Sequence, residues 1–150
     1  MNVIIRQATD ADVGHVTLCV CQAFMHYILL IGKQPQPMLD NYKALIDTQK
    51  VVVATLEEKI AGVLVLDINE EGFCIETLAV YPVAQGAGIG RKLINFAENV
   101  AKNSGFKSIY LSTNRLMTKS QQIYSHLGYE IYDERVINGY DRLYLRKQLT

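Results

Sequence analysis

The feature that most constrains this chain is the segment VYPVAQGAGIGRKL, residues 80–93. An apolar run leads into three glycines spaced two residues apart, Gly86, Gly88 and Gly90, and a helix-like pattern follows. Glycine lacks the Cβ atom that would hold a ligand away from the backbone N–H groups. Such N–H groups, at the positive end of a following helix, favour an anion. The segment therefore predicts a phosphate-binding loop; the alternative is a plain strand-to-helix turn.

The spacing of the glycines separates three kinds of phosphate-binding loop. A P-loop requires Gly-x-x-x-x-Gly-Lys-Ser/Thr, and this pattern does not occur in the sequence. A dinucleotide fingerprint requires Gly-x-Gly-x-x-Gly, but the third position counted from Gly86 is Arg91. A nucleotide or dinucleotide enzyme is therefore disfavoured. A third pattern, Gln/Arg-x-x-Gly-x-Gly/Ala, is met in full by residues 85–90.

Hydrophobic periodicity predicts strands and helices on both sides of this loop. Strands are expected over residues 3–8, 50–56, 59–68, 72–81, 107–113, 129–137 and 140–149. Helices are expected from Thr9 or Asp10 toward Leu30, from Pro37 over residues 38–49, from Gly88 to Ser104, and over residues 119–127. Asn138-Gly139 predicts a two-residue hairpin turn. The order indicates an α/β (α+β) fold with a mixed, mostly antiparallel central sheet of about seven strands and helices on both faces.

Length and composition narrow the class of protein. The chain has 150 residues, which predicts one domain over residues 1–150. Its 15 basic and 15 acidic residues balance, so neither nucleic acid nor a membrane surface is an expected partner. No signal peptide or membrane span is evident. The three cysteines, Cys19, Cys21 and Cys74, do not suit disulfides or a metal site, which predicts a reducing cytoplasm and no metal.

Three segments together resemble one known family. IETLAVYPVAQGAGIGRKL, residues 75–93, resembles the coenzyme A-binding motif of the GNAT superfamily, whose members transfer acetyl groups to amines. IRQATDAD, residues 5–12, and IYSHLGYE, residues 123–130, resemble the opening and the C-terminal segment of that family. The outer segments, including GYDRLYLRKQL, are similar to a bacterial GNAT branch whose acceptors are mostly undefined.

The resemblance implies how the coenzyme binds. The donor would be acetyl-CoA, and the backbone of Leu78, Ala79 and Val80 would pair with its pantetheine arm as an added strand does. The pyrophosphate would be surrounded by the loop residues Gln85, Gly86, Ala87, Gly88, Ile89, Gly90 and Arg91. Many relatives carry Asn at the position of Met117, and here Asn114 would replace it. Ser120 would either cap the following helix or contact the coenzyme.

The chemistry of acetyl transfer calls for a proton acceptor and a proton donor. An alkyl amine is mostly protonated at neutral pH and must lose a proton, while the departing thiolate must gain one. Tyr124 lies where GNAT enzymes place the tyrosine that faces the coenzyme sulfur, although a core tyrosine is the alternative. Glu76, on the coenzyme strand, is the candidate acceptor, and an exposed or salt-bridged carboxylate is equally expected there. Asp133 and Glu134 are weaker candidates.

The acceptor amine is less constrained. In GNAT folds the segment between the first two helices forms a wall of the acceptor site, and here it is apolar and aromatic, with His26 and Tyr27 as candidate contacts. We therefore expect a primary amine of a small molecule with an apolar portion. A protein or peptide amine, or a non-catalytic module that binds acyl-CoA, are the alternatives. Cys74 has no histidine near it in sequence, which disfavours an acyl-cysteine route. The resemblance is also compatible with a homodimer.

Overall fold

The computed structural model describes residues 2–150. Its strands (β), α-helices (α) and 3-10 helices (η) are β1 Val3–Gln7, η1 Asp10–Asp12, α1 Val13–Phe24, α2 Tyr27–Ile31, η2 Gln36–Leu39, α3 Tyr42–Asp47, β2 Val51–Leu56, β3 Lys59–Asn69, β4 Gly72–Val80, η3 Pro82–Ala84, α4 Ile89–Asn103, β5 Ser108–Asn114, α5 Thr118–His126, β6 Glu130–Ile137 and β7 Tyr140–Gln148. The strands form a 7-stranded sheet in the order β1-β2-β3-β4-β5-β7-β6, with β4 and β5 parallel. The predicted mixed, mostly antiparallel sheet is confirmed.

The predicted helix from Thr9 or Asp10 toward Leu30 is wrong in its continuity. The chain forms η1 first, where the carboxylate of Asp12 accepts the N–H of Thr9 at 2.8 Å. After α1 the N–H of Ile28 donates to Met25 O at 3.2 Å, a three-residue step that interrupts the helical ladder before α2. Apolar periodicity does not report such a change of hydrogen-bond pattern.

The second predicted helix is also divided. Pro37 lies in the first turn of η2, as expected, but Asp40 is extended and ends it. Asn41 then caps α3, because its side-chain oxygen accepts the N–H of Ala44 at 3.1 Å. The hydroxyl of Tyr42 donates to Pro37 O at 2.6 Å and ties the two short helices together.

The predicted hairpin turn at Asn138 and Gly139 is confirmed. Asn138 and Gly139 both have positive φ, 53° and 79°, as a type I′ hairpin turn requires. Glu57 and Glu58 make the same kind of turn between β2 and β3, with φ of 52° and 69°. Gly105 follows α4 with φ of 88° and ends that helix.

The contacts of the chain divide it into two compact units. The N-terminal unit comprises the chain up to Leu66 together with Thr77–Ala97, and the C-terminal unit comprises Asp67–Glu76 and Glu98–Thr150. Both β3 and β4 therefore contribute residues to each unit, and so does α4.

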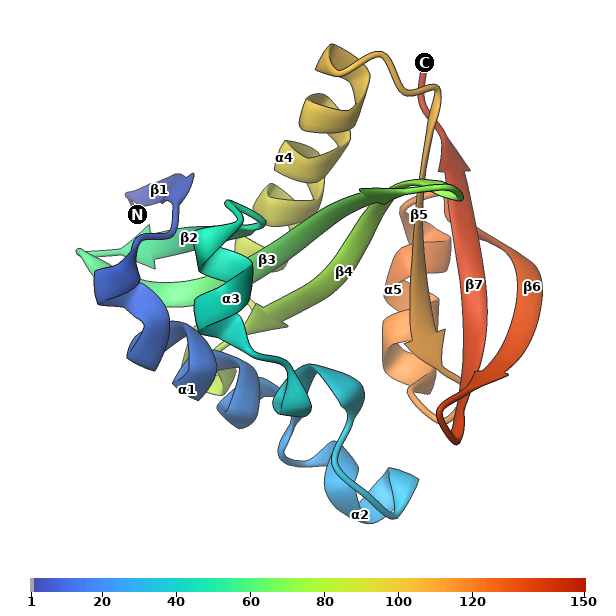
Figure 1. Ribbon diagram of the computed structural model, residues 1–150, viewed down its shortest axis with the longest axis horizontal. Helices are drawn as coiled ribbons and strands as arrows, with labels where there is room; N and C mark the ends of the chain where they lie inside the picture. Colours follow the sequence, from blue (N-terminus) through green and yellow to red (C-terminus); the bar gives the residue numbers. More distant parts are fainter. Residues whose placement is uncertain (1) are drawn as a thin grey trace. The chain divides into compact units, whose positions relative to one another are not determined.

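The N-terminal unit carries helices on both faces of its strands. Figure 1 shows α1 and α3 side by side against β2 and β3, where they cover a core of Val16, Val20, Ile46, Val51, Val53, Val63, Val65 and Ala79. Because side chains alternate along a strand, Gly62 faces the opposite side from Val63. On that side the first turns of α4 approach so closely that a Cβ atom on Gly62 would lie 2.9 Å from Leu93 Cδ1.

In the C-terminal unit the strands run in the order β4-β5-β7-β6. β4 pairs in parallel with β5 over Phe73–Ile75, and β7 pairs antiparallel with both β5 and β6. Tyr129 is 2% exposed, and its hydroxyl donates to Glu98 Oε2 at 2.8 Å. Lys147 Nζ donates to Glu98 Oε1 at 3.0 Å, so the end of α4 is anchored to β7.

The contact at Gly62 leads to a stability prediction. A Cβ there would also lie 3.0 Å from Ile89 Cγ2 and 3.3 Å from the backbone oxygen of Ala79. We expect Gly62→Ala to lower the free energy of unfolding by about 1–3 kcal/mol, as overpacking does. Gly14→Ala in α1 is the matched control, because a Cβ at Gly14 would meet nothing within 4 Å. It should stabilise the chain by about 0.4–1 kcal/mol in urea denaturation. Equal midpoints for Gly62→Ala and the parent would contradict this close packing.

Candidate active site

The glycine loop follows β4 directly and leads into α4. Gly86 and Gly88 have φ of 88° and 80°, a left-handed backbone that favours glycine. A Cβ at either position would meet no protein atom within 4 Å, so the space beside both residues is open. The predicted order of strand, glycine loop and helix is therefore observed, and two of the three glycines are needed for their backbone conformation.

Several backbone donors of this loop have no acceptor within the protein. Among residues 2–150, the N–H groups of Gly86 and Gly88 donate to no protein oxygen, whereas Ala87 N–H donates to Ala84 O at 3.4 Å. The first N–H groups of α4 lack intrahelical partners, as at every helix start. α4 has 15 residues, and its aligned peptide dipoles place partial positive charge at this end. The loop thus offers what an anion such as a pyrophosphate requires.

The side chains of the loop hold its shape. Gln85 Nε2 donates to Val80 O at 3.1 Å, which ties the loop back to the end of β4. Gln85 and Arg91 are exposed, Ala87 is half-buried, and Ile89, the first residue of α4, is buried. A Cβ at Gly90 would lie 3.7 Å from Val80 Cγ2, in ordinary contact distance. Of the predicted coenzyme strand, Ala79 is buried, and Leu78 and Val80 are half-buried.

Tyr124 lies on α5 in the C-terminal unit and is half-buried. Its ring meets the ring of Tyr129 edge to face, with the centroids 5.7 Å apart. The hydroxyl of Tyr129 donates a hydrogen bond to Glu98, so Tyr124 packs against a ring whose position is fixed by that bond. Tyr129 itself is buried and serves as a packing residue.

Glu76 and Cys74 lie on one face of β4. Glu76 is exposed, and Cys74 Sγ lies 4.0 Å from its Oε1 atom. Burial, and next the charge of Glu76, raise the pKa of the Cys74 thiol well above its ordinary value. A thiol that stays protonated is a poor nucleophile, which argues against an acyl-cysteine route.

The two weaker candidate acceptors are engaged in ion pairs. Asp133 accepts a hydrogen bond from Arg135 Nε at 2.7 Å, and this bond lowers the pKa of the Asp133 carboxyl. Glu134 accepts a hydrogen bond from Arg115. A carboxylate that is stabilised by a guanidinium is a weaker base, so Asp133 is poorly suited to accept a proton.

The corner between β5 and α5 differs in part from the expectation. Asn114 ends β5, and its side-chain oxygen accepts the N–H of Leu116 at 2.9 Å. This oxygen is therefore already engaged within the protein. Met117 is buried. The proposed capping role of Ser120 is wrong, because α5 begins at Thr118 after Met117 and has no side-chain cap. Ser120 is the third residue of the helix, too late to serve as its N-cap.

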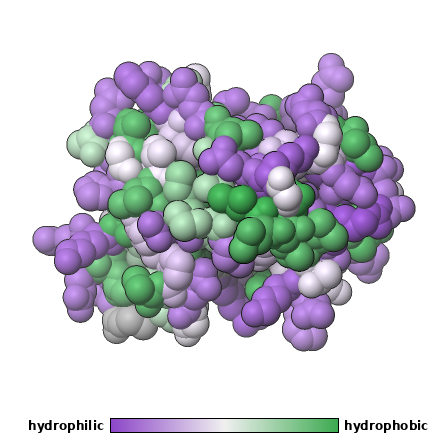
Figure 2. All heavy atoms as spheres, turned by 90° about the horizontal axis from the view of Figure 1, so that it is seen from below, coloured by the Kyte–Doolittle hydropathy of each residue, from purple (hydrophilic) through white to green (hydrophobic). Residues whose placement is uncertain are grey.

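The predicted acceptor segment is apolar and exposed. His26 precedes α2, and its ring centroid lies 3.9 Å from that of Tyr27. Figure 2 shows a hydrophobic patch on the face seen from below, where α2 lies in Figure 1. Exposed apolar residues of this segment and of η2 are Met25, Leu29, Leu30 and Leu39, of which Leu29 is 96% exposed.

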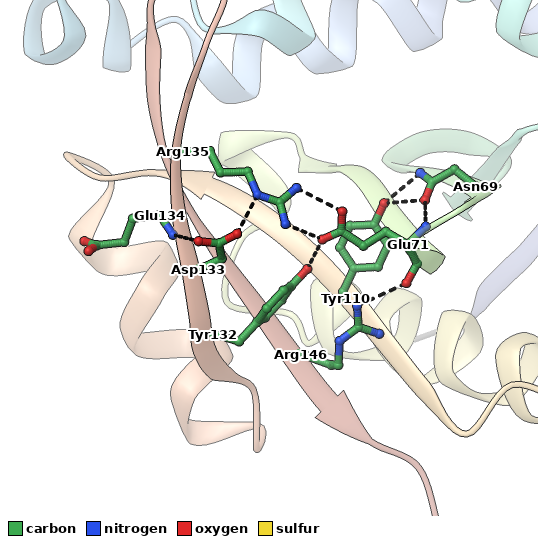
Figure 3. Close-up of polar contacts among 8 residues, drawn as sticks. All are labelled: Asn69, Glu71, Tyr110, Tyr132, Asp133, Glu134, Arg135 and Arg146. Carbon is green, nitrogen blue, oxygen red and sulfur yellow. Dashed lines mark hydrogen bonds and ion pairs between the residues drawn. The ribbon is translucent and has the colours of Figure 1, made fainter.

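A polar network that the sequence analysis did not find crosses the C-terminal unit. Figure 3 shows Arg135 of β6 reaching Glu71, in the turn before β4, where its Nη1 and Nη2 atoms donate to the carboxylate at 2.9 and 2.8 Å. The hydroxyl of Tyr132 donates to the same carboxylate, and Arg146 Nη2 donates to Glu71 O at 3.1 Å. These bonds, first that from Arg135, lower the pKa of Glu71 and raise that of Arg135.

One sequence signal could have pointed to this face. In the last strand Tyr140, Arg142, Tyr144 and Arg146 alternate with other residues, so all four share one side of β7. The guanidinium of Arg135 stacks on the ring of Tyr144, 4.1 Å from its centroid. The partner Glu71 is 64 residues from Arg135, and no local pattern connects them.

Comparison with known proteins identifies the family. The model of the acetyltransferase (GNAT) domain matches residues 47–131, more than half of the chain. The chain therefore belongs to the GNAT family of acetyltransferases, and the predicted enzyme class, an acyltransferase, is confirmed. The match contains the glycine loop, Glu76 and Tyr124.

Individual relatives are more distant. The uncharacterised N-acetyltransferase YjgM of Escherichia coli (strain K12) is 32% identical over 73 residues, which span 48% of this chain and 44% of that protein. PaiA N-acetyltransferase from Thermoplasma acidophilum, solved in complex with coenzyme A, has a TM-score of 0.76 at 16% identity and covers 99% of both chains. The ribosomal-protein-S18-alanine N-acetyltransferase of Escherichia coli also has a TM-score of 0.76, at 14% identity, covering 99% of this chain and 95% of that one. These structures share the fold.

Within residues 2–150, no group of three or more His, Cys, Asp or Glu side chains is placed to hold a metal ion. None of the helices in this described part of the chain is long and apolar enough to cross a membrane.

The network at Glu71 leads to a pH prediction. Its pKa is lowered from an ordinary value of 4.5, so its contribution to stability is complete above about pH 4.5 and is lost as the pH falls through the lowered value. We expect Glu71→Gln to cost about 1 kcal/mol at neutral pH, because partial exposure weakens charged hydrogen bonds. The cost should shrink in acid, as urea denaturation at a series of pH values would show. Glu70→Gln, at the exposed neighbouring position, is the control; an equal cost at every pH would contradict the assignment.

Proposed function

We propose that this chain transfers the acetyl group of acetyl-CoA to a primary amine of a small molecule, by direct attack of the amine while both substrates are bound. The observation that carries the proposal is the loop of Gly86 and Gly88, with its unused backbone donors at the start of α4. The coenzyme A bound in the related fold from Thermoplasma acidophilum supports the same donor. The loop would hold the pyrophosphate, and the backbone of Leu78, Ala79 and Val80 would bind the pantetheine arm.

The proposed chemistry uses two side chains of the C-terminal unit. Acetyl-CoA supplies a thioester whose thiolate departs when the amine forms the new C–N bond. Glu76 would accept the amine proton through water, and its exposure on β4 supports this role. Tyr124 would give its phenolic proton to the thiolate, and its packing against Tyr129 supports a fixed orientation. The apolar surface at Met25, Leu29 and Leu30, with His26 and Tyr27 beside it, favours an acceptor that has an apolar portion.

Gly88 provides a test of the loop. Gly88→Asn keeps the positive φ, which Asn tolerates, but places a side chain in the space where the pyrophosphate would lie. We expect the Kd for coenzyme A to rise by at least about tenfold, or about 1.4 kcal/mol, in calorimetric titration. Gly105→Asn is the matched control, since Gly105 has φ of 88° and equally open surroundings but ends α4 far along the chain. Unchanged affinity in Gly88→Asn, or parental binding of ATP or NADH in place of coenzyme A, would contradict the proposal.

Tyr124 provides a test of turnover. Tyr124→Phe removes the hydroxyl but keeps the ring and its contact with Tyr129, so we expect kcat to fall by about 10²–10⁴-fold with little change in coenzyme A affinity. Thiol release across a panel of amines and peptides measures this. Tyr132→Phe, which also removes a hydroxyl of the C-terminal unit, should keep the parental kcat. A variant at Tyr124 with full parental kcat would refute the role, and a parent that binds acetyl-CoA without releasing thiol would favour a binding module.

Glu76 provides a test of proton acceptance. Glu76→Gln should lower kcat/KM most at low pH, where few amine molecules are already neutral, and the loss should shrink toward the pKa of the amine. The pH profiles of kcat/KM for variant and parent measure this difference. A loss that is equal at every pH would instead indicate that Glu76 only positions its neighbours. The cytoplasmic location and the homodimer remain predictions.

A further inference from the structure

We propose that Arg142 binds a carboxylate of the acceptor, and that the acceptors of this enzyme are therefore amino acids or compounds that carry a carboxylate near the reacting amine. The inference rests on the proposed function and specifies its substrate class. Its starting point is the sheet face of the C-terminal unit that carries Glu76.

The strand register places Arg142 on the same sheet face as Glu76. Cys74 pairs with Tyr110, and Tyr110 pairs with Arg146, so these residues share a face. Residues an even number of positions away lie on that face as well, which adds Glu76, two residues after Cys74 on β4, and Arg142, four residues before Arg146 on β7. The pairing of β4 with β5 ends at Ile75 and Leu111, so Glu76 lies just beyond the paired part of β4, while Arg142 pairs with Asn114 at the end of β5.

The contacts of Arg142 differ from those of the other arginines nearby. Its Nη1 atom reaches only Ser112 Oγ, at 3.5 Å, the outer limit of a hydrogen bond, and its guanidinium lies 5.7 Å from the ring centroid of Tyr140. Within residues 2–150, no carboxylate oxygen lies within 4.0 Å of it. It is only half-buried, so a ligand can reach it.

The carboxylates around Arg142 are already used by other arginines. Asp141, its neighbour in sequence, accepts from Arg115 Nε at 2.9 Å on the opposite face, and Arg115 also pairs with Glu134. Arg135, its cross-strand partner in the register, is neutralised by Glu71 and Asp133. Figure 3 shows Asp133 turned toward Arg135 and Glu134 turned away from that network. The guanidinium of Arg142 thus has N–H donors available for a ligand and no carboxylate partner among residues 2–150.

The chemistry of such a site is specific. A guanidinium binds a carboxylate through two parallel N–H···O bonds, and its positive charge repels a protonated amine. The ligand would therefore place its carboxylate at Arg142 and its amine toward Glu76, the proposed proton acceptor. In an amino acid the two groups are joined by a single carbon, and the side chain of Arg142 together with the water that links the amine to Glu76 would cover the rest of the span.

The test compares L-amino acids with their primary amides, with rates expressed per neutral amine. We expect the parent to prefer the acids by about 10–100-fold in kcat/KM, the range of hydrogen bonds to a charged group. Arg142→Gln should remove this preference and bring the ratio of acid to amide in kcat/KM to about one. Arg142→Lys keeps the charge but cannot form two parallel hydrogen bonds with a carboxylate, so its preference for acids should lie between those of the parent and Arg142→Gln. Arg115→Gln is the matched control and should keep the preference, and melting temperatures should show that each variant folds.

Two readouts separate this inference from the proposed function. Turnover of any amine tests the function, whereas calorimetric titration of the amino acids into protein saturated with coenzyme A tests Arg142 alone. Tighter binding of acids than of amides, lost in Arg142→Gln, supports the inference even if turnover is absent, in which case only the proposed function fails. The inference would be overturned if the parent does not prefer the acids in binding or turnover. It would also be overturned if Arg142→Gln retains the preference.

Discussion

The close approach of α4 to the sheet at Gly62 is the contact on which the coenzyme loop depends. Ile89 and Leu93 occupy the space that a side chain at residue 62 would take, so the first turn of α4 is seated directly on the strands. The loop of Gly86 and Gly88 has to join the end of β4 to this helix within a few residues. Its left-handed glycines make that short connection possible and leave the N–H groups directed away from the protein's own acceptors.

The C-terminal unit is organised by a different principle, the pairing of charges on both faces of its sheet. Arg135 is satisfied by Glu71 and Asp133, and Arg115 by Glu134 and Asp141. These pairs hold the β6–β7 hairpin against the turn before β4 and against the start of α5. They also leave Arg142 without a carboxylate partner among residues 2–150. The proposed carboxylate site is thus defined by how the other arginines are paired.

The structural features that are predicted correctly depend on backbone conformation or on local order. Gly86 and Gly88 are recognisable because only glycine adopts their backbone angles readily, and Asn138-Gly139 for the same reason. The continuity of the first two predicted helices and the capping role of Ser120 are predicted less well, since each depends on which neighbouring group accepts a particular hydrogen bond. Periodicity shows which residues are apolar, and it does not show where a hydrogen-bond ladder is interrupted.

The sequence by itself determined the strand, glycine loop and helix that define the family, the alternation of the strands, and the short turns that join them. Tertiary structure alone decided which carboxylate neutralises which arginine. Glu71 and Arg135 are 64 residues apart, and Arg115 and Asp141 are 26 apart. The reason is physical: backbone conformation is set by the few residues around each position, whereas a charge is neutralised by whatever the folded chain brings within about 4 Å of it.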